Sequence, residues 1–141
     1  MATAEFKEVL PVDRDKLYAA IIRYEDYPKF VEGCTKVVVD RKPGGKVRCT
    51  YHISMMKNVV YTLDHVEKPE KGEVHWKLVD SDTFKMNQGR WKIKSAGEGK
   101  TDVDYEVDVE FKIPVPSFLL NRIVKGSLPA MMKGFQKQAK K

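Results

Sequence analysis

Histidine is the side chain that changes charge near neutral pH, and one of the three histidines in this sequence is predicted to point inward. His65 has the same strand parity as Tyr61, whereas His52 and His75 have the parity of charged or small polar neighbours. A histidine buried beside Tyr51 and Tyr61 could donate to a carbonyl oxygen, or act as a general acid or base. The alternative is a core histidine whose hydrogen bonds the protein itself satisfies. His65 is therefore the only catalytic candidate.

The sequence does not indicate other catalytic arrangements. Asp64 and Asp80 have the parity opposite to their inward neighbours, so no pair of carboxylates is expected for acid–base work. Neither Cys34 nor Cys49 has an obvious histidine partner, and no serine lies in a nucleophile-elbow sequence. Because the two cysteines also lack metal-ligand spacing, we expect buried thiols, no metal site and no cofactor.

Length and composition set the scale of the molecule. With 141 residues, 42% of them hydrophobic, residues 1–141 fit one domain whose core could enclose a pocket. No apolar run approaches the roughly 18 to 20 residues that span a bilayer, and the first residues lack the apolar stretch of a signal peptide. We therefore expect an unexported, cytoplasmic protein.

The net charge of +6 has an uneven origin. The last 26 residues contain no acid and six basic side chains, namely Arg122, Lys125, Lys133, Lys137, Lys140 and Lys141. These lysines and the arginine could form a solubilising outer helix face, with cations near the helix C-terminus as the helix dipole favours. Alternatively, they could contact anionic membrane lipids, with nucleic acid or the ribosome as a less favoured partner.

The longest strand is predicted at residues 101–113, because apolar and charged residues alternate there without interruption. The apolar positions are Val103, Tyr105, Val107, Val109, Phe111 and Ile113. A period of two places these side chains on one face, so one face of the sheet should be buried and the other solvated. The acidic outer face should lie beside Arg90, Lys92 and Lys94 of the preceding strand.

Six further strands are predicted at residues 5–10, 36–41, 46–54, 59–67, 73–80 and 83–94. Turn signals such as the Pro43-Gly44-Gly45 run connect them as hairpins, which favours an antiparallel sheet. In the last of these strands, Phe84 has the opposite parity to Trp91, and we place a β-bulge at Gly89 to reset the register.

Helical patterns occupy two places. After the first strand, Asp13 can cap a helix that ends near Asp26, and a short second helix or turn follows at residues 27–33. Residues 117–141 read as one long helix with a continuous apolar stripe. A kink is expected between Gly126 and Pro129, either to wrap the helix over a curved sheet or to act as a hinge that opens a cavity.

Four segments carry a resemblance to a known family: residues 24–31 (YEDYPKFV), 76–79 (WKLV) and 84–91 (FKMNQGRW), and Val115-Pro116 ahead of the last helix. In these segments the chain resembles the START-like (SRPBCC) superfamily, specifically its polyketide cyclase/dehydrase and coenzyme-Q-binding branch. The resemblance covers nearly the whole chain and implies an α+β helix-grip fold. In that fold a seven-stranded antiparallel sheet has two short helices after its first strand and a long C-terminal helix packed over it.

The resemblance also implies a mostly apolar cavity between the sheet and the long helix. Candidates for its walls are the inward residues Tyr51, Tyr61, His65, Trp76, Trp91, Tyr105 and Phe111. Phe30, Leu120 and Met131 are expected near its mouth or lid. The same aromatic side chains could instead fill a core that contains no pocket.

A cavity of this kind would bind or transport a hydrophobic small molecule, such as a lipid, an isoprenoid quinone or a polyketide-like ring. A non-catalytic role is favoured, because the case for an enzyme depends on resemblance alone. The first alternative is an aromatase/cyclase-type enzyme in which His65 and the tyrosines orient the substrate. The second is a ribosome-associated START-like protein whose basic helix contacts RNA.

Overall fold

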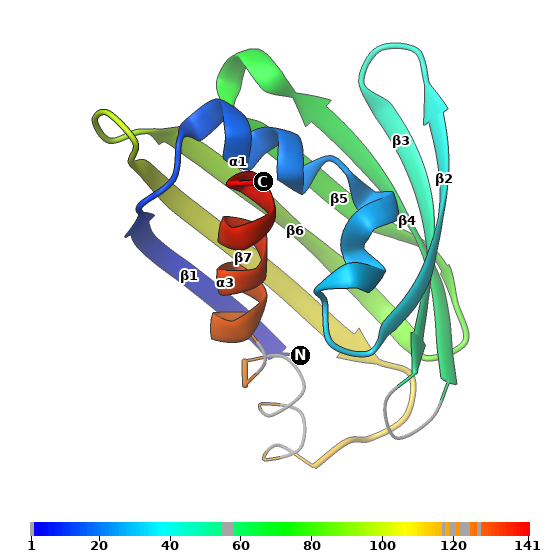
Figure 1. The fold of residues 1–141 in the computed structure, drawn as a ribbon. Coiled ribbons are helices and arrows are strands. Elements are labelled where there is room, and N and C mark those ends of the chain that lie inside the picture. Colours follow the sequence, from blue (N-terminus) through cyan, green and yellow to red (C-terminus); the bar gives the residue numbers. More distant parts are fainter. Residues whose placement is uncertain (1, 55–57, 117, 119–120, 122–124, 127) are drawn as a thin grey trace.

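The computed structural model describes residues 2–54, 58–116, 118, 121, 125–126 and 128–141. Its main element is a seven-stranded antiparallel sheet with the order β1-β7-β6-β5-β4-β3-β2 (Figure 1). The strands are β1 (Ala2–Leu10), β2 (Cys34–Lys42), β3 (Lys46–Ser54), β4 (Asn58–Lys68), β5 (Glu73–Ser81), β6 (Phe84–Ser95) and β7 (Thr101–Phe111). Consecutive strands from β2 to β7 are neighbours, and β1 pairs with β7 to form one edge. The predicted seven-stranded antiparallel sheet is confirmed.

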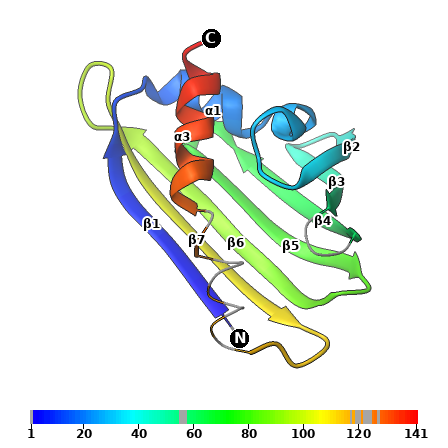
Figure 2. The ribbon, with the colours of Figure 1, turned by 60° about the horizontal axis from the view of Figure 1, so that its bottom comes forward.

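The helices lie together on one face of this sheet (Figure 2). They are α1 (Arg14–Ile21), the 3-10 helix η1 (Tyr24–Lys29) and α3 (Leu128–Ala139), while the short η2 (Pro69–Lys71) joins β4 to β5. Asp13 caps α1 as predicted, since its carboxylate accepts from the backbone N–H groups of Asp15 and Lys16 at 3.1 Å each. The first helix ends earlier than predicted, at Ile21. The arrangement is nevertheless the predicted helix-grip α+β fold.

The hydrophobic core lies between the helices and the inner face of the sheet. Every second residue of β7 from Thr101 to Val109 is buried, as the alternation predicted. On the outer face, Arg90 forms ion pairs with Asp104 at 3.3 Å and with Glu106 at 3.0 Å. The predicted pairing of the basic residues of β6 with the acidic residues of β7 is therefore confirmed.

β7 is shorter than predicted, because its partner strand stops. Phe84 at the start of β6 pairs with Phe111, and beyond this pair the backbone N–H of Lys112 makes one further bond, to the Thr83 carbonyl oxygen at 2.9 Å, before the ladder ends. Pro114 also removes a backbone donor. Ile113 consequently lies outside the sheet and 59% of its surface is exposed.

The predicted bulge at Gly89 is wrong. The register of β6 and β7 shifts between Phe84 and Met86, so Lys85 is the extra residue, and Gly89 pairs regularly with Val107. Gly89 is needed for a different reason. A Cβ at this position would come within 2.5 Å of the Trp76 ring, so the missing side chain makes room for the indole.

The C-terminal helix also differs from the prediction. A turn at Lys125 and Gly126 precedes α3, which begins at Leu128. Pro129 therefore lies in the first turn of α3, where the missing backbone N–H has no intrahelical partner to lose. The helix predicted over residues 117–141 is thus broken by a turn next to the place where a kink was expected, between Gly126 and Pro129. The predicted stripe residues Leu120 and Val124 lie outside the described residues.

Across the described ranges, no helix is both long and apolar enough to cross a membrane.

Candidate functional site

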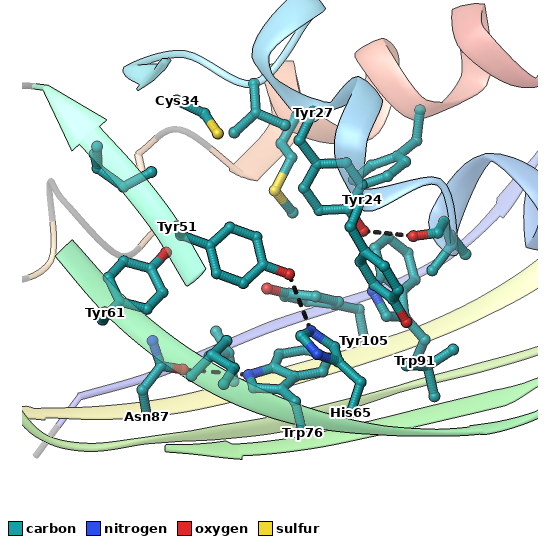
Figure 3. A pocket seen from close by; sticks show the side chains of 18 residues that line it. Tyr24, Tyr27, Cys34, Tyr51, Tyr61, His65, Trp76, Asn87, Trp91 and Tyr105 are labelled. Carbon is teal, nitrogen blue, oxygen red and sulfur yellow. Dashed lines mark hydrogen bonds between the residues drawn. The ribbon is translucent and has the colours of Figure 1, made fainter. Parts of the chain in front are cut away.

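A cavity of about 160 Å³ lies between the inner face of the sheet and the helices (Figure 3). Residues of α1, η1, α3 and strands β2 to β7 contribute to its wall, as does the segment after η1. The wall is mainly aromatic, and it includes Tyr24, Tyr27, Tyr51, Tyr61, His65, Trp76, Trp91, Tyr105 and Phe135.

Most of the side chains proposed from the sequence border this cavity. Those that do are Tyr51, Tyr61, His65, Trp76, Trp91, Tyr105 and Met131. Phe111 does not, because it packs on Phe84 at a ring distance of 5.0 Å, and Phe84 in turn contacts Tyr61. Phe30 follows η1 directly, and its ring packs on Phe135 of α3 at 4.9 Å, on the helical side of the cavity. Leu120 lies outside the described residues.

His65 and Tyr51 form a hydrogen-bonded pair in the cavity wall. The His65 Nδ1 lies 3.3 Å from the carbonyl oxygen of Val47, which can only accept, so Nδ1 carries the proton. The other ring nitrogen, Nε2, then accepts from the Tyr51 hydroxyl at 3.0 Å. Burial lowers the pKa of His65 to about 4, so the imidazole is neutral at pH 7.

Tyr24 and Tyr27 from η1 cover the other side of this pair. The Tyr24 ring lies 4.5 Å from the His65 ring, and its hydroxyl donates to Glu67 at 2.8 Å. The Tyr27 hydroxyl donates to the carbonyl oxygen of Ile21 at 2.6 Å. Burial raises the pKa of both phenols. Both hydroxyls are therefore occupied by protein partners, and these tyrosines offer the cavity mainly their ring faces.

Asn87 is a second polar group in the wall. The Trp76 indole nitrogen, Nε1, donates to the Asn87 oxygen at 3.2 Å. Indole N–H groups cannot accept, which fixes the amide with its oxygen toward Trp76 and its nitrogen directed elsewhere. Figure 3 shows the amide nitrogen on the side of Asn87 away from Trp76.

The hydroxyls of Tyr61 and Tyr105 have no hydrogen-bond partner among the described residues. Burial raises the pKa of both phenols, so they stay protonated. In the described part of the chain no fully buried side-chain nitrogen or oxygen lacks a partner. The unpaired hydroxyls and the Asn87 amide nitrogen therefore border open space, where a bound molecule could use them.

None of the described residues that line the cavity carries a charge. No carboxylate is among them, and the thiol of Cys34, which is one of them, has a pKa raised by burial. Within the described residues, no group of three or more His, Cys, Asp or Glu side chains could hold a metal ion. An apolar wall with a few neutral hydrogen-bonding groups suits an uncharged, largely apolar molecule.

Another hollow, of about 540 Å³, lies along β1 beside Leu128 and Pro129. Its lining includes Glu5, Glu8 and Lys125, and it lacks the convergent aromatic and polar groups of the first cavity. The smaller, aromatic cavity is therefore the better candidate for a binding site.

The sequence analysis did not select Tyr24, Tyr27, Asn87 or Phe135 as site residues. The spacing of Phe135 from Met131 placed both on the inner stripe of the last helix, which was a usable signal. Tyr24 and Tyr27 lie in a 3-10 helix, whose rotation about its axis the sequence pattern does not fix. Asn87 was missed because the misplaced bulge put it on the outer face.

Comparison with known proteins agrees with this fold. The family model described as polyketide cyclase/dehydrase and lipid transport matches residues 10–136. The aromatase/cyclase Zhui from Streptomyces sp. R1128 is similar in structure, with a TM-score of 0.86 and 11% identity over 99% of this chain and 93% of that chain. A START superfamily protein from Mycobacterium smegmatis has a TM-score of 0.82 and 16% identity over 98% and 97% of the two chains.

A curated relative is the ribosome association toxin RatA of Escherichia coli K12. It is 20% identical over 132 residues, which cover 94% of this chain and 83% of the relative.

Proposed function

Because this chain belongs to the polyketide cyclase/dehydrase and lipid transport family, we propose that it binds or carries a small hydrophobic molecule in the cavity between the sheet and the helices. The observation that supports this most directly is the cavity itself. Its wall combines aromatic rings with a few neutral polar groups that converge on open space. That combination is typical of sites for small organic ligands.

The cavity volume limits what can enter. At about 160 Å³ it is close to the roughly 150 Å³ of an engineered cavity that binds benzene. It is smaller than the about 300 to 1,000 Å³ typical of pockets for drug-sized molecules. We therefore expect one ring, or one end of a larger lipid, quinone or polyketide-like molecule, to occupy the cavity in this conformation.

Binding is favoured over catalysis because the described lining residues include no strong acid or base. His65 is neutral, its pKa of about 4 makes it a weak base, and its free ring nitrogen is already bonded to Tyr51. An aromatase/cyclase reaction would need a group that takes a proton from an enolisable ring. Loss of turnover in His65→Ala with unchanged ligand binding would instead favour the enzyme.

Native mass spectrometry and solvent extraction of the purified protein test the proposal. The wild type should release an apolar molecule, and the variant Val31→Trp should release less, because Val31 lines the cavity and a larger ring there would fill it. The matched control is Val38→Trp on β2, where the valine is 48% exposed. Absence of any extracted molecule, together with no binding of added toluene, would contradict the proposal.

One relative supports a second candidate function, association with the ribosome. The relative that covers 94% of this chain is named a ribosome association toxin, and Lys133, Lys137 and Lys140 on or beside α3 are exposed. Salt-dependent cosedimentation with ribosomes tests this function, and replacement of the three lysines by glutamine should abolish it. Anionic lipid vesicles provide a parallel assay, because the same lysines suit lipid headgroups.

A further inference from the structure

In two hydrogen bonds of the cavity wall, Tyr51 to His65 and Trp76 to Asn87, the chemistry of the partners fixes which group donates. These directions determine whether a ligand must donate or accept at each place. Most hydroxyl groups can rotate and either donate or accept, so the unpaired hydroxyls of Tyr61 and Tyr105 adapt to a ligand. Tyr51 and Asn87 cannot adapt in this way, because each is already committed to a protein partner.

Tyr51 presents an acceptor to the cavity. The single proton of neutral His65 is directed at the Val47 carbonyl, so the Tyr51 hydroxyl must use its own proton to bond the other ring nitrogen. Only the lone pairs of the Tyr51 oxygen remain for a ligand. Turning the Tyr51 proton toward a ligand would leave a buried histidine nitrogen without a partner, which costs more than one ordinary hydrogen bond provides.

Asn87 presents a donor to the cavity. Its oxygen accepts from the Trp76 indole, so its amide nitrogen, which carries two N–H groups, is the part left for a ligand. The two fixed groups come from different strands, β3 and β6, and their side chains project into the same space in Figure 3.

Resting on the binding function proposed above, we propose that the ligand is an uncharged ring with a hydroxyl group that donates to Tyr51 and a carbonyl group that accepts from Asn87. This is the chemistry of a neutral hydroxyaryl or enol carbonyl compound. A hydrocarbon chain offers neither group, and an oxidised quinone offers no hydroxyl. Ionised phenolates and carboxylates are disfavoured, because no cationic side chain is found among the described residues of the cavity wall.

A panel of single-ring probes tests this inference in NMR titrations of the labelled protein. The probes are benzene, anisole, phenol and 4-hydroxybenzaldehyde, which differ in the hydrogen-bonding groups on one ring. Phenol should bind roughly two- to tenfold more tightly than anisole, which has no donor. 4-Hydroxybenzaldehyde should bind more tightly than phenol by a similar factor, and it should shift the side-chain amide signals of Asn87.

The variant His65→Leu tests the direction of the Tyr51 bond. With the imidazole gone, the Tyr51 proton is free to bond a ligand oxygen, so the phenol-to-anisole affinity ratio should fall toward one. The control is His75→Leu, because His75 bonds Glu73 on the outer face and does not line the cavity. This control should keep the wild-type ratio. If His65→Leu does not fold, the affinities of the wild type for the four probes still test the proposed ligand chemistry.

The outcomes separate the two proposals. Equal affinity for phenol, anisole and benzene would overturn the assignment of ligand chemistry and leave cavity binding intact. Failure of all four probes to bind would overturn the assignment of ligand chemistry, and together with the absence of any extracted molecule it would overturn cavity binding as well. Tighter binding of anisole than of phenol by the wild type would also contradict the inference, because a ring without a donor would then bind better than one with a donor.

Discussion

The hydroxyl of Tyr24 donates to the carboxylate of Glu67 over 2.8 Å, and this bond joins η1 to β4. Arg41 on β2 reinforces the link, since its guanidinium lies 3.1 Å from the Ile22 carbonyl oxygen and 3.8 Å from the same carboxylate. The helical cover of the cavity is thus held to the sheet by polar contacts at its edge.

Replacement of Tyr24 by phenylalanine should lower the free energy of unfolding by about 1 to 2 kcal/mol. The change removes a partly buried hydrogen bond and leaves one carboxylate oxygen of Glu67 without that donor. Urea denaturation measures the effect. The control is Tyr61→Phe, which removes a hydroxyl that has no partner among the described residues and should cost less than about 0.5 kcal/mol. Equal losses in the two variants would contradict this account.

Stability should depend on His65 between pH 6.5 and 4. Burial lowers its pKa from 6.5 to about 4 in the folded protein, so the unfolded chain binds the extra proton first as the pH falls. The free energy of unfolding should therefore decrease over this interval, by at most roughly 3 kcal/mol from this residue. Urea titrations of wild type and His65→Leu at several pH values measure the difference. Parallel curves for the two proteins would show that His65 contributes nothing.

Replacement of Gly89 by alanine should destabilise the protein by about 1 to 3 kcal/mol, because the new methyl group would collide with the Trp76 ring and the Glu106 carbonyl oxygen. Thermal and urea unfolding measure the loss. In the double variant Gly89→Ala/Trp76→Leu the alanine should cost less than in the wild-type background, since part of the collision is gone. Strict additivity of the two changes would argue against the contact.

The strands were predicted well from the sequence, but the structural role of Gly89 was not. Alternation marks the buried face of a strand directly, so the inward positions of Tyr51, His65 and Trp76 could be read without knowing the neighbouring strands. A glycine inside a strand has two physical explanations, a bulge or the close approach of another group. Only the pairing of Gly89 opposite Trp76 distinguishes them, and pairing is a long-range property.

The misplaced bulge is also the reason why Asn87 was not predicted as a site residue. With the extra residue at Lys85, Asn87 shares the inward parity of Trp91, whereas a bulge at Gly89 turns Asn87 outward. Tyr24 and Tyr27 were missed for a different reason. They belong to a short 3-10 helix whose orientation is set by its contacts with Glu67 and Ile21.

Trp76→Ala should widen the range of ligands that the cavity accepts. The indole forms part of the cavity wall, so its removal opens volume beside Asn87. We expect 2-naphthol, which has two rings, to bind at least about tenfold more tightly to Trp76→Ala than to the wild type. Trp76→Phe is the matched control, because it also loses the indole N–H but retains a ring. Calorimetric titration measures both, and an equal gain in the control would show that ring size does not limit binding.

The hydrogen-bonded pair of Tyr51 and His65 and the rings that cover it come from different regions of the chain. Val47, His65 and Tyr51 all lie on the paired strands β3 and β4, where Val47 is directly opposite His65. The rings that cover them come from η1, near the beginning of the chain, and from α3, at its end. A substitution in one region therefore leaves the residues of the other region unchanged in type, although the two regions are in contact through Tyr24 and His65. Substitutions in β3 and β4 would alter which functional groups of a ligand are recognised. Substitutions in η1 and α3 would alter which ligand shapes fit.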